Sequence, residues 1–192
     1  MACALAFSTL GAPAAAATII KDPNPPKYSV EIEPHLNVQY FYATYGAHGF
    51  GPGVRFGIPI VSPGFIKTIN NSVAISFGAD IFYLQPNEKR FCDRAGCYDY
   101  EGKGFWALYS PVTMQWNFWI TEKWSAFGEP GVVLRTLVSE DSACDRKWGC
   151  KTNDSFVWWS FYAGARFHFS DRMALTLRAG YPTGVSVGLS IF

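Results

Sequence analysis

The stretch YSVEIEPHLNVQYFY (28–42) decides the fold, because its residues alternate in character along most of its length. Even-numbered residues from Val30 to Tyr42 are apolar or aromatic, whereas odd-numbered residues from Glu31 to Gln39 are charged or polar. A period of two residues is that of an extended strand, whose successive side chains point to opposite sides. The stretch therefore predicts a β-strand with two unlike faces, and the class of protein depends on which face meets solvent.

The same alternation occurs in eight segments of the chain. Pro, Gly, Asn and Asp gather between these segments, as expected for turns. Most segments exceed the five or six residues typical of soluble strands, and about 9–11 residues are needed for a tilted strand to cross a bilayer. The predicted strands are 28–45, 53–61, 73–84, 105–118, 124–138, 155–169, 173–181 and 184–192.

Sorting the segments by parity separates an apolar face from a polar face. The apolar face carries no charged residue in any segment. The polar face carries four acids and four arginines among small and amide side chains. These charged residues are Glu31, Glu33, Arg55, Asp80, Glu129, Arg135, Arg166 and Arg178, accompanied by the histidines His35 and His168.

The equal numbers of acids and arginines indicate which face is enclosed. In a soluble barrel the apolar face would have to pack many tryptophan and phenylalanine rings inside eight strands, which leave room only for side chains or one small ligand. In a membrane barrel that face meets lipid, and each enclosed charge needs a partner because an isolated one is costly. The sequence therefore predicts an all-β protein, an eight-stranded antiparallel up-and-down transmembrane β-barrel, whose lumen holds these eight residues as an ion-pair network.

Composition agrees with this fold and argues against several functions. Aromatic residues make up 17% of the chain, and many lie near predicted strand ends, where membrane barrels carry aromatic girdles. Charged residues make up only 16%, against roughly 25% in soluble domains. The net charge of +1 does not suggest a nucleic-acid partner. The sequence shows no phosphate-binding glycine loop, metal-binding helix or nucleophile elbow, so we expect no cofactor and no metal.

An up-and-down barrel gathers alternate connectors at opposite ends, and here most short connectors fall at one end and the long ones at the other. SPGFIKTINNS (62–72) is longer than expected for the short-turn end. The tight turns ITEK (120–123) and SDR (170–172) share one end. The long polar loops 85–104 and 139–154 share the other end with GAHGFGPG (46–53), which we expect to be a hairpin connection. This asymmetry is typical of bacterial outer-membrane barrels. Because loops usually carry recognition, the two long loops are the expected contact with a surface partner.

The two long loops carry four cysteines in two close pairs, Cys92 with Cys97 and Cys144 with Cys150. Paired cysteines in an exported chain indicate an oxidising compartment. Local disulfides 92–97 and 144–150 are the simplest pairing among the three connectivities that four cysteines allow. A zinc site formed by all four is the alternative, although their spacings are looser than usual for zinc ligands.

The N-terminal part of the chain differs from the rest. Residues 4–17 are apolar and small and end in an alanine-rich stretch, which is typical of the second half of a secretory signal. We expect residues 1–17 to be a signal segment cleaved near Ala16 or Ala17, with Cys3 discarded. Residues 18–27 form a proline-rich lead-in, and residues 28–192 form the barrel.

With these features the chain resembles the small eight-stranded outer-membrane β-barrel proteins of Gram-negative bacteria. The resemblance spans residues 28–192 and includes the ending GVSVGLSIF (184–192), which finishes in the aromatic Phe192. In that family the barrel-assembly machinery reads a terminal aromatic residue, so Phe192 is the implied assembly signal. One departure is that Ile191, and not Phe192, shares the parity of the preceding apolar residues. The resemblance implies the cell outer membrane, with bilayer lipid and lipopolysaccharide as neighbours.

The expected function is non-enzymatic: a barrel with a closed, charge-paired lumen that displays disulfide-braced loops in a structural or recognition role. A narrow ion-conducting pore lined by the same charges is the first alternative. A lipid A deacylase is a second, because His168 and Ser170 stand two residues apart as in that family; the Asp-Arg that follows departs from its Asn-Ala. A soluble lipocalin-like ligand-binding barrel is the third.

Overall fold

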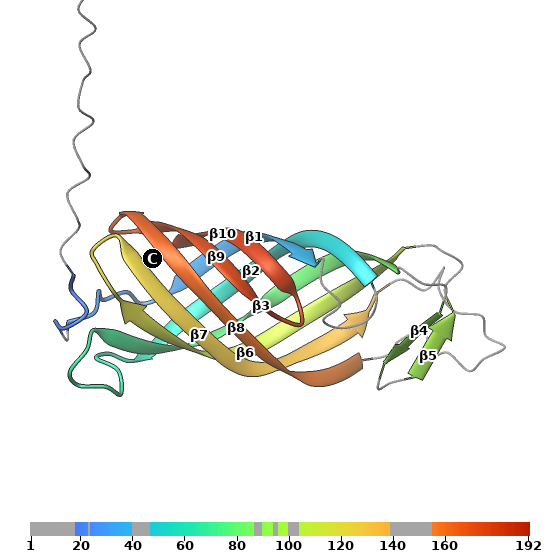
Figure 1. Ribbon diagram of the computed structural model, residues 1–192, viewed down its shortest axis with the longest axis horizontal. Helices are drawn as coiled ribbons and strands as arrows, with labels where there is room; N and C mark the ends of the chain where they lie inside the picture. The colour runs from blue at the N-terminus through green and yellow to red at the C-terminus, as the bar shows by residue number, and fades with distance from the viewer. Residues whose placement is uncertain are drawn as a thin grey trace, which may run out of the picture.

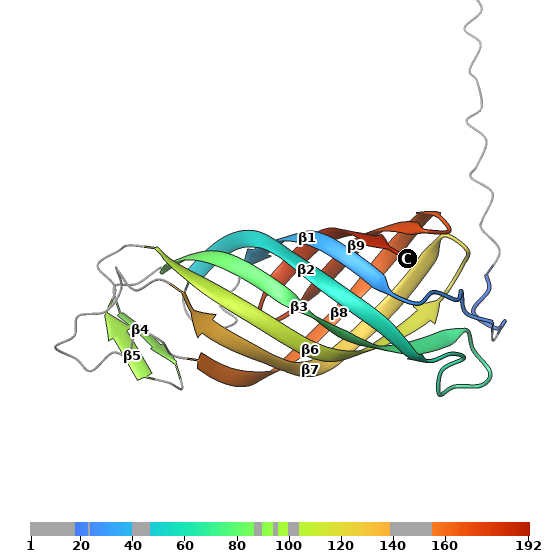
Figure 2. The ribbon, with the colours of Figure 1, turned by 180° about the vertical axis from the view of Figure 1, so that it is seen from behind.

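Eight antiparallel strands close into one barrel in the computed structural model (Figures 1 and 2). The structure describes residues 18–22, 24–39, 47–86, 90–93, 96–99, 104–138 and 155–192. Each barrel strand pairs with its neighbours along the chain, and the first pairs with the last to close the sheet. The strands are β1 (Glu31–Gln39), β2 (Ala47–Val61), β3 (Asn71–Pro86), β6 (Phe105–Trp119), β7 (Trp124–Leu137), β8 (Ser155–Ser170), β9 (Met173–Tyr181) and β10 (Gly184–Ile191). The predicted fold class is confirmed.

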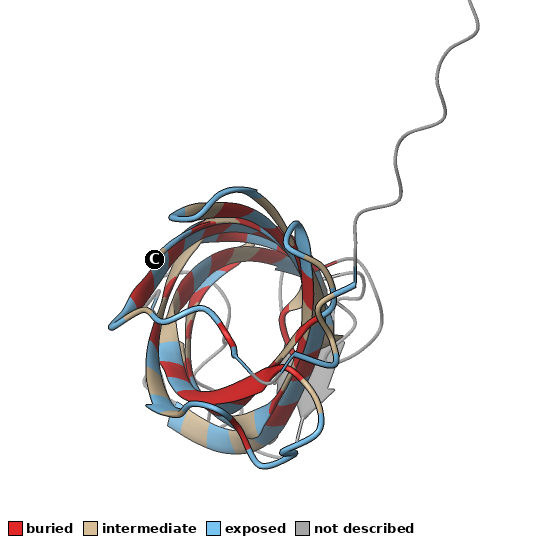
Figure 3. Ribbon diagram, turned by 90° about the vertical axis from the view of Figure 1, so that its left-hand side faces the viewer, coloured by how far each residue is buried: buried red, intermediate tan, exposed pale blue. Residues whose placement is uncertain are grey.

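The polarity of the barrel is inverted relative to a soluble one. Along β1 the burial of residues alternates strictly, so that Glu33 is 1% exposed whereas Leu36 is 67% exposed. The same alternation of buried and exposed bands runs around the barrel in Figure 3, which looks along the barrel from its C-terminal end. The apolar side chains therefore cover the outside, and the charged side chains are enclosed. This arrangement contradicts the soluble lipocalin-like alternative, which needs the apolar face inside.

Strand β2 begins at Ala47, so the prediction that GAHGFGPG (46–53) is a hairpin connection was wrong for most of this stretch. Its glycines occupy inward positions at which a side chain has no room. A Cβ on Gly51 would collide with the carbonyl of Ile81, and a Cβ on Gly53 would collide with the Asp80 carboxylate and the His35 ring. The glycines thus allow close packing against the neighbouring strands β1 and β3, although the composition of the stretch resembles that of a turn.

The long connection between β3 and β6 contains a further hairpin. Strands β4 (Arg90–Asp93) and β5 (Gly96–Asp99) form a separate two-stranded sheet. In Figure 1 this hairpin lies beyond the barrel, at the end opposite the C-terminus. The sequence predicts a loop over 85–104, because its polar residues show no alternation, and the structure adds this hairpin within it.

An apolar cluster fills part of the barrel interior. Its residues come from the parts of β3, β6 and β7 that adjoin the long connections. The expectation of a lumen filled only by small and charged residues was therefore incomplete. The cluster consists of Phe82, Leu84, Phe105, Ala107, Tyr109 and Val133, with Leu137 and Trp158 packed against it.

The described residues before β1 (18–22 and 24–30) cross the end of the barrel that carries the short turns, opposite the end with the apolar cluster (Figure 3). The Ile19 amide donates a hydrogen bond of 2.9 Å to the carbonyl of Ile120, in the turn between β6 and β7. The Asn70 amide, just before β3, donates one of 2.7 Å to the carbonyl of Ile20. No helix in the described part of the chain is long and apolar enough to cross a membrane.

Candidate functional site

The strands bring the enclosed charges together through strand alternation and register. Alternation places Glu31, Glu33 and His35 on the inner face of β1. Register places Arg55 of β2 opposite Glu33, and pairs Gly53 with both His35 and Asp80. The inner face at the start of the sheet therefore alternates in charge between neighbouring strands, which favours ion pairing across the lumen.

Arg178 of β9 is the centre of the resulting network. Its guanidinium holds Glu33 through two parallel contacts, Nη1 to Oε1 at 2.5 Å and Nη2 to Oε2 at 2.9 Å. Its Nε also donates to Oε2 of Glu129 at 3.2 Å. A guanidinium can satisfy two carboxylates in this way because its donors lie in a planar fork.

A second group forms around Asp80 of β3. Arg55 Nη2 donates to Asp80 Oδ2 at 2.9 Å, and His35 Nε2 lies 2.7 Å from Asp80 Oδ1. His35 Nδ1 lies 3.0 Å from the carbonyl oxygen of Glu33. Both ring nitrogens of His35 therefore face oxygen atoms. Arg55 also lies 3.8 Å from Glu129, which connects this group to Arg178.

Arg166 of β8 is the third cation in the network. Its Nη2 lies 2.7 Å from Glu31 Oε1, and its Nη1 donates to the Asn117 side chain at 2.7 Å. Its guanidinium lies 4.4 Å from the centre of the Phe127 ring, close enough for a cation–π contact.

Polar side chains join these groups into one network to which all eight barrel strands contribute. Gln115 of β6 donates to Glu129 at 2.6 Å, and Asn117 donates to Gln115 at 3.3 Å. Ser190 of β10 donates to Glu31 at 2.7 Å. The network holds the four carboxylates of Glu31, Glu33, Asp80 and Glu129 and the three guanidinium groups of Arg55, Arg166 and Arg178, with the His35 ring beside Asp80. Such pairing matters because burying an unpaired charge costs several kcal/mol or more.

The contacts described above join seven of the eight charged residues expected in the lumen, and the eighth, Arg135, is also buried. Arg135 of β7 is buried and stands opposite Tyr109 in the register of β6 and β7, beside the apolar cluster. Sequence reasoning missed the cluster itself. The stretch IFYL (81–84) carried a signal for the cluster, because all four residues are apolar or aromatic and half of them must therefore face inward. The inward residues are Phe82 and Leu84.

The C-terminal Phe192 lies at the end of the barrel that carries the short turns. Its ring centre is 5.0 Å from that of Tyr28 and 5.6 Å from that of His168. These contacts agree with the sequence pattern, in which Ile191 and not Phe192 falls on the outward face of the last strand. An outward Phe192 ring would meet lipid instead of Tyr28 and His168. Its use as an assembly signal remains a prediction.

Two further sets of sequence-predicted residues are placed only in part. Cys92 and Cys97 stand directly opposite each other in the β4–β5 register; Cys144 and Cys150 lie outside the described residues. His168 Nε2 lies 2.8 Å from the hydroxyl of Ser125, whereas the Ser170 hydroxyl accepts a hydrogen bond from the Arg172 amide. The His168–Ser170 pair that motivated the deacylase alternative is thus not hydrogen-bonded in the structure.

No protein-family model and no curated protein matches the sequence. Among solved structures, the attachment invasion locus protein Ail of Yersinia pestis, in complex with the heparin analogue sucrose octasulfate, is 15% identical, with a TM-score of 0.43 over 85% of this chain and 95% of Ail. Ail in a phospholipid bilayer nanodisc is 14% identical, with a TM-score of 0.44 over 85% of this chain and 99% of Ail. The outer membrane protein OprG of Pseudomonas aeruginosa is 10% identical, with a TM-score of 0.46 over 88% of this chain and 92% of OprG.

The fold follows from the geometry of this chain. Eight antiparallel strands close with no free edge, as spanning a membrane with strands requires. Apolar side chains face outward along the strands, and an ion-paired network is enclosed. The chain has the fold of the small eight-stranded outer-membrane β-barrels.

Proposed function

We propose that this protein is a non-enzymatic barrel of the Gram-negative outer membrane, with a closed lumen and with loops that serve recognition at the cell surface. The observation that carries the proposal is the single network of ion pairs and hydrogen bonds to which every barrel strand contributes. A continuous water path would have to separate these pairs. Separating a pair inside the barrel would leave each charge without its partner, and an uncompensated buried charge typically costs several kcal/mol.

The apolar cluster supports closure independently of the charges. Phe82 and Tyr109 pack edge to face with ring centres 5.3 Å apart, and both are at most 1% exposed. They lie toward the long connections, whereas Glu31 and Arg166 lie toward the short turns. An ion would therefore meet an apolar barrier and a charged barrier in series, which argues against the narrow-pore alternative.

The long connections at one end support a recognition role. The β4–β5 hairpin projects beyond the barrel rim, within the loop 85–104 (Figure 1). A rigid barrel that presents hairpins and loops is a common scaffold for binding. The proposal places loops 85–104 and 139–154 outside the cell and the turns 120–123 and 170–172 in the periplasm. Bilayer lipid and lipopolysaccharide then surround the apolar exterior, and the barrel-assembly machinery inserts the chain.

Planar-bilayer recording of the purified protein tests the closed lumen. We expect no steady single-channel openings from the wild-type barrel over a range of voltages. A heat-modifiable shift on a denaturing gel, seen before the recording, establishes that the barrel is folded. Steady openings of uniform size from folded protein would overturn the proposal and establish the pore instead.

A matched pair of variants extends the conductance test. Phe82→Ala removes a buried ring from the apolar cluster, whereas Ile81→Ala removes an exposed apolar side chain from the adjacent position. Because the charged network remains in place, both variants should stay closed. Openings that arise only with Phe82→Ala would show that the cluster alone blocks the lumen, contrary to the proposed sealing by the ion pairs.

A further inference from the structure

The connection between β2 and β3, residues 62–70, is longer than the two turns at the same end of the barrel and carries large apolar side chains. Phe65 is 58% exposed, and Ile66 is 38% exposed. Lys67, which follows them, is also exposed. In Figures 1 and 2 this connection projects to the side of the barrel wall. Neighbouring apolar side chains exposed in this way mark a contact surface.

The loop folds back over the outer wall of the barrel. The Phe65 ring meets the Trp116 ring edge to face, with their centres 5.9 Å apart. Trp116 shares the outward parity of Val112 on β6 and lies three residues before Trp119, where that strand ends. Three residues of strand span about 10 Å. The Phe65 ring therefore lies against the part of the wall that faces lipid, and does not extend away from the barrel end.

The Asn71 side chain, which is fully buried, holds the loop in this position. Its Nδ2 donates hydrogen bonds of 2.7 Å to the carbonyl oxygens of both Ile66 and Ile69. Its Oδ1 accepts a hydrogen bond of 3.0 Å from the Trp116 indole. Gly64 permits this close packing, because a Cβ there would collide with the Asn71 amide. These contacts satisfy polar groups of the loop and of Trp116 within the protein, as polar groups beside hydrocarbon require.

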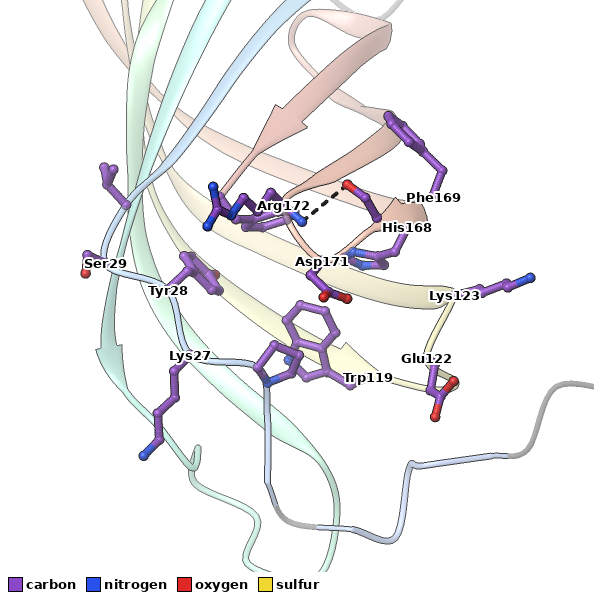
Figure 4. A pocket seen from close by; sticks show the side chains of 14 residues that line it. Lys27, Tyr28, Ser29, Trp119, Glu122, Lys123, His168, Phe169, Asp171 and Arg172 are labelled. Carbon is purple, nitrogen blue, oxygen red and sulfur yellow. Dashed lines mark hydrogen bonds between the residues drawn. The ribbon is translucent and has the colours of Figure 1, made fainter.

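Charged side chains mark the water boundary at this end of the barrel. Lys27, Glu122 and Lys123 are exposed, and in Figure 4 their side chains point away from the strands. Glu122 and Lys123 follow the end of β6, so Trp116 and the Phe65 ring on it lie on the hydrocarbon side of this boundary. A lysine beside such a boundary can lay its aliphatic stem along apolar surface and keep its ammonium group in water. Lys67 is therefore suited to reach the phosphates of lipid headgroups.

We propose that loop 62–70 is an interfacial anchor, which inserts Phe65 and Ile66 into the phospholipid leaflet beside the barrel and places Lys67 at the headgroup phosphates. That this leaflet is the periplasmic one rests on the orientation given in the proposed function. Through Trp116 the apolar patch is continuous with the outward face of the barrel. Lysine is depleted at the cores of protein interfaces, so the adjacent Lys67 favours lipid over a protein partner.

A polarity-sensitive dye on an introduced cysteine measures the depth of the loop. Ile66→Cys carries the dye beside an intact Phe65, Val112→Cys is the reference in lipid, and Glu122→Cys is the reference in water. Each protein is folded into phosphatidylcholine vesicles, and a heat-modifiable gel shift establishes folding. The natural cysteines stay unreduced, and unsubstituted protein treated with the same dye measures labelling at other sites. Iodide on both sides of the membrane quenches dye in water, and a nitroxide phospholipid quenches dye in the leaflet.

We expect iodide to quench the dye at position 66 severalfold less than at position 122, and the nitroxide lipid to quench it severalfold more. Phe65→Ala in the Ile66→Cys protein should raise quenching by iodide, because the ring that lies against the wall is lost. Thr68→Ala is the matched control in the same loop, because Thr68 is exposed and should leave the depth unchanged. Equal effects of these two substitutions would overturn the anchoring role of Phe65.

The reference positions separate failure of the anchor from failure of the proposed function. Equal quenching at positions 66 and 122, with position 112 still protected from iodide, would overturn the anchor and leave the membrane barrel intact. Access of iodide to position 112 as well would overturn the membrane barrel together with the anchor. Protection at position 66 that disappears when the protein is diluted with excess lipid would show that a second copy of the chain covers the loop, which also overturns the lipid anchor.

Discussion

At the scale of single residues, an odd or even position along a strand indicates which face of the sheet a side chain lies on, but not which residue it contacts. Alternation alone predicted that Glu33, Asp80 and Arg178 share the inner face, and they are buried there. It could not predict that Arg178 holds Glu33 and Glu129 together, because that contact crosses the lumen between β1, β7 and β9. Such partners depend on strand tilt and register around the closed barrel, which no single strand encodes.

Arg178→Met should be the most damaging substitution of a single lumen charge. It leaves the Glu33 and Glu129 carboxylates without their principal cation, and such a loss typically costs about 3–5 kcal/mol. Urea unfolding in lipid vesicles, followed by tryptophan fluorescence, measures the change in unfolding free energy. The exposed Arg172→Met should stay within about 0.5 kcal/mol of the wild type. Equal stability of the two variants would contradict the central role of Arg178.

At the scale of the elements, prediction succeeded where turns are distinct and failed where composition misleads. The predicted strands 173–181 and 184–192 match β9 and β10 to within one residue, because a short turn precedes each of them. Strand β2 begins six residues earlier than the predicted 53, since its inward glycines resemble a loop. Packing distinguishes these strand glycines from loop glycines. Gly53 leaves the space that His35 and Asp80 fill, and these two neighbours can be identified only in the folded barrel.

Two glycine substitutions test this account of β2. Gly53→Ala places a methyl group against the Asp80 carboxylate and the His35 ring, so it should destabilise the barrel by about 1–3 kcal/mol. Gly128→Ala on β7 meets no atom within 4 Å and should be neutral or slightly stabilising. The same urea titration distinguishes them. A tolerated Gly53→Ala would mean that the glycine serves another purpose than packing.

The β4–β5 hairpin allows one disulfide to be predicted more sharply than the sequence could. Cys92 and Cys97 are direct cross-strand partners. Opposed residues in antiparallel strands have Cα atoms about 4.5 or 5.5 Å apart, and both values lie within the disulfide range. Mass spectrometry of a non-reduced digest of exported protein should therefore recover the 92–97 bridge. A peptide that links either residue to Cys144 or Cys150 would show a different connectivity.

At the scale of the whole molecule, the inverted polarity was predictable because it sums over every strand. One strand with a charged inner face could belong to many proteins. Eight strands with polar or charged residues on the inner face, closed edge to edge and apolar outside, fit a barrel that exposes its exterior to lipid. The apolar cluster in the lumen was less predictable, because an inward Phe82 beside an outward Ile81 breaks the contrast on which parity depends.

The substitution Val112→Arg tests whether lipid surrounds the barrel. Val112 is the central residue of β6, Phe105–Trp119, and is 52% exposed on the outer face. On a soluble barrel an arginine at such a site would change stability by about 0.5 kcal/mol or less. In a bilayer the same charge lies near the midplane of the hydrocarbon and should cost about 2–4 kcal/mol. Glu122→Arg, in the turn between β6 and β7, keeps its charge in water and should have little effect. Unfolding free energies measured in phospholipid vesicles separate the cases, and a Val112→Arg barrel as stable as the Glu122→Arg control would exclude a lipid-facing exterior.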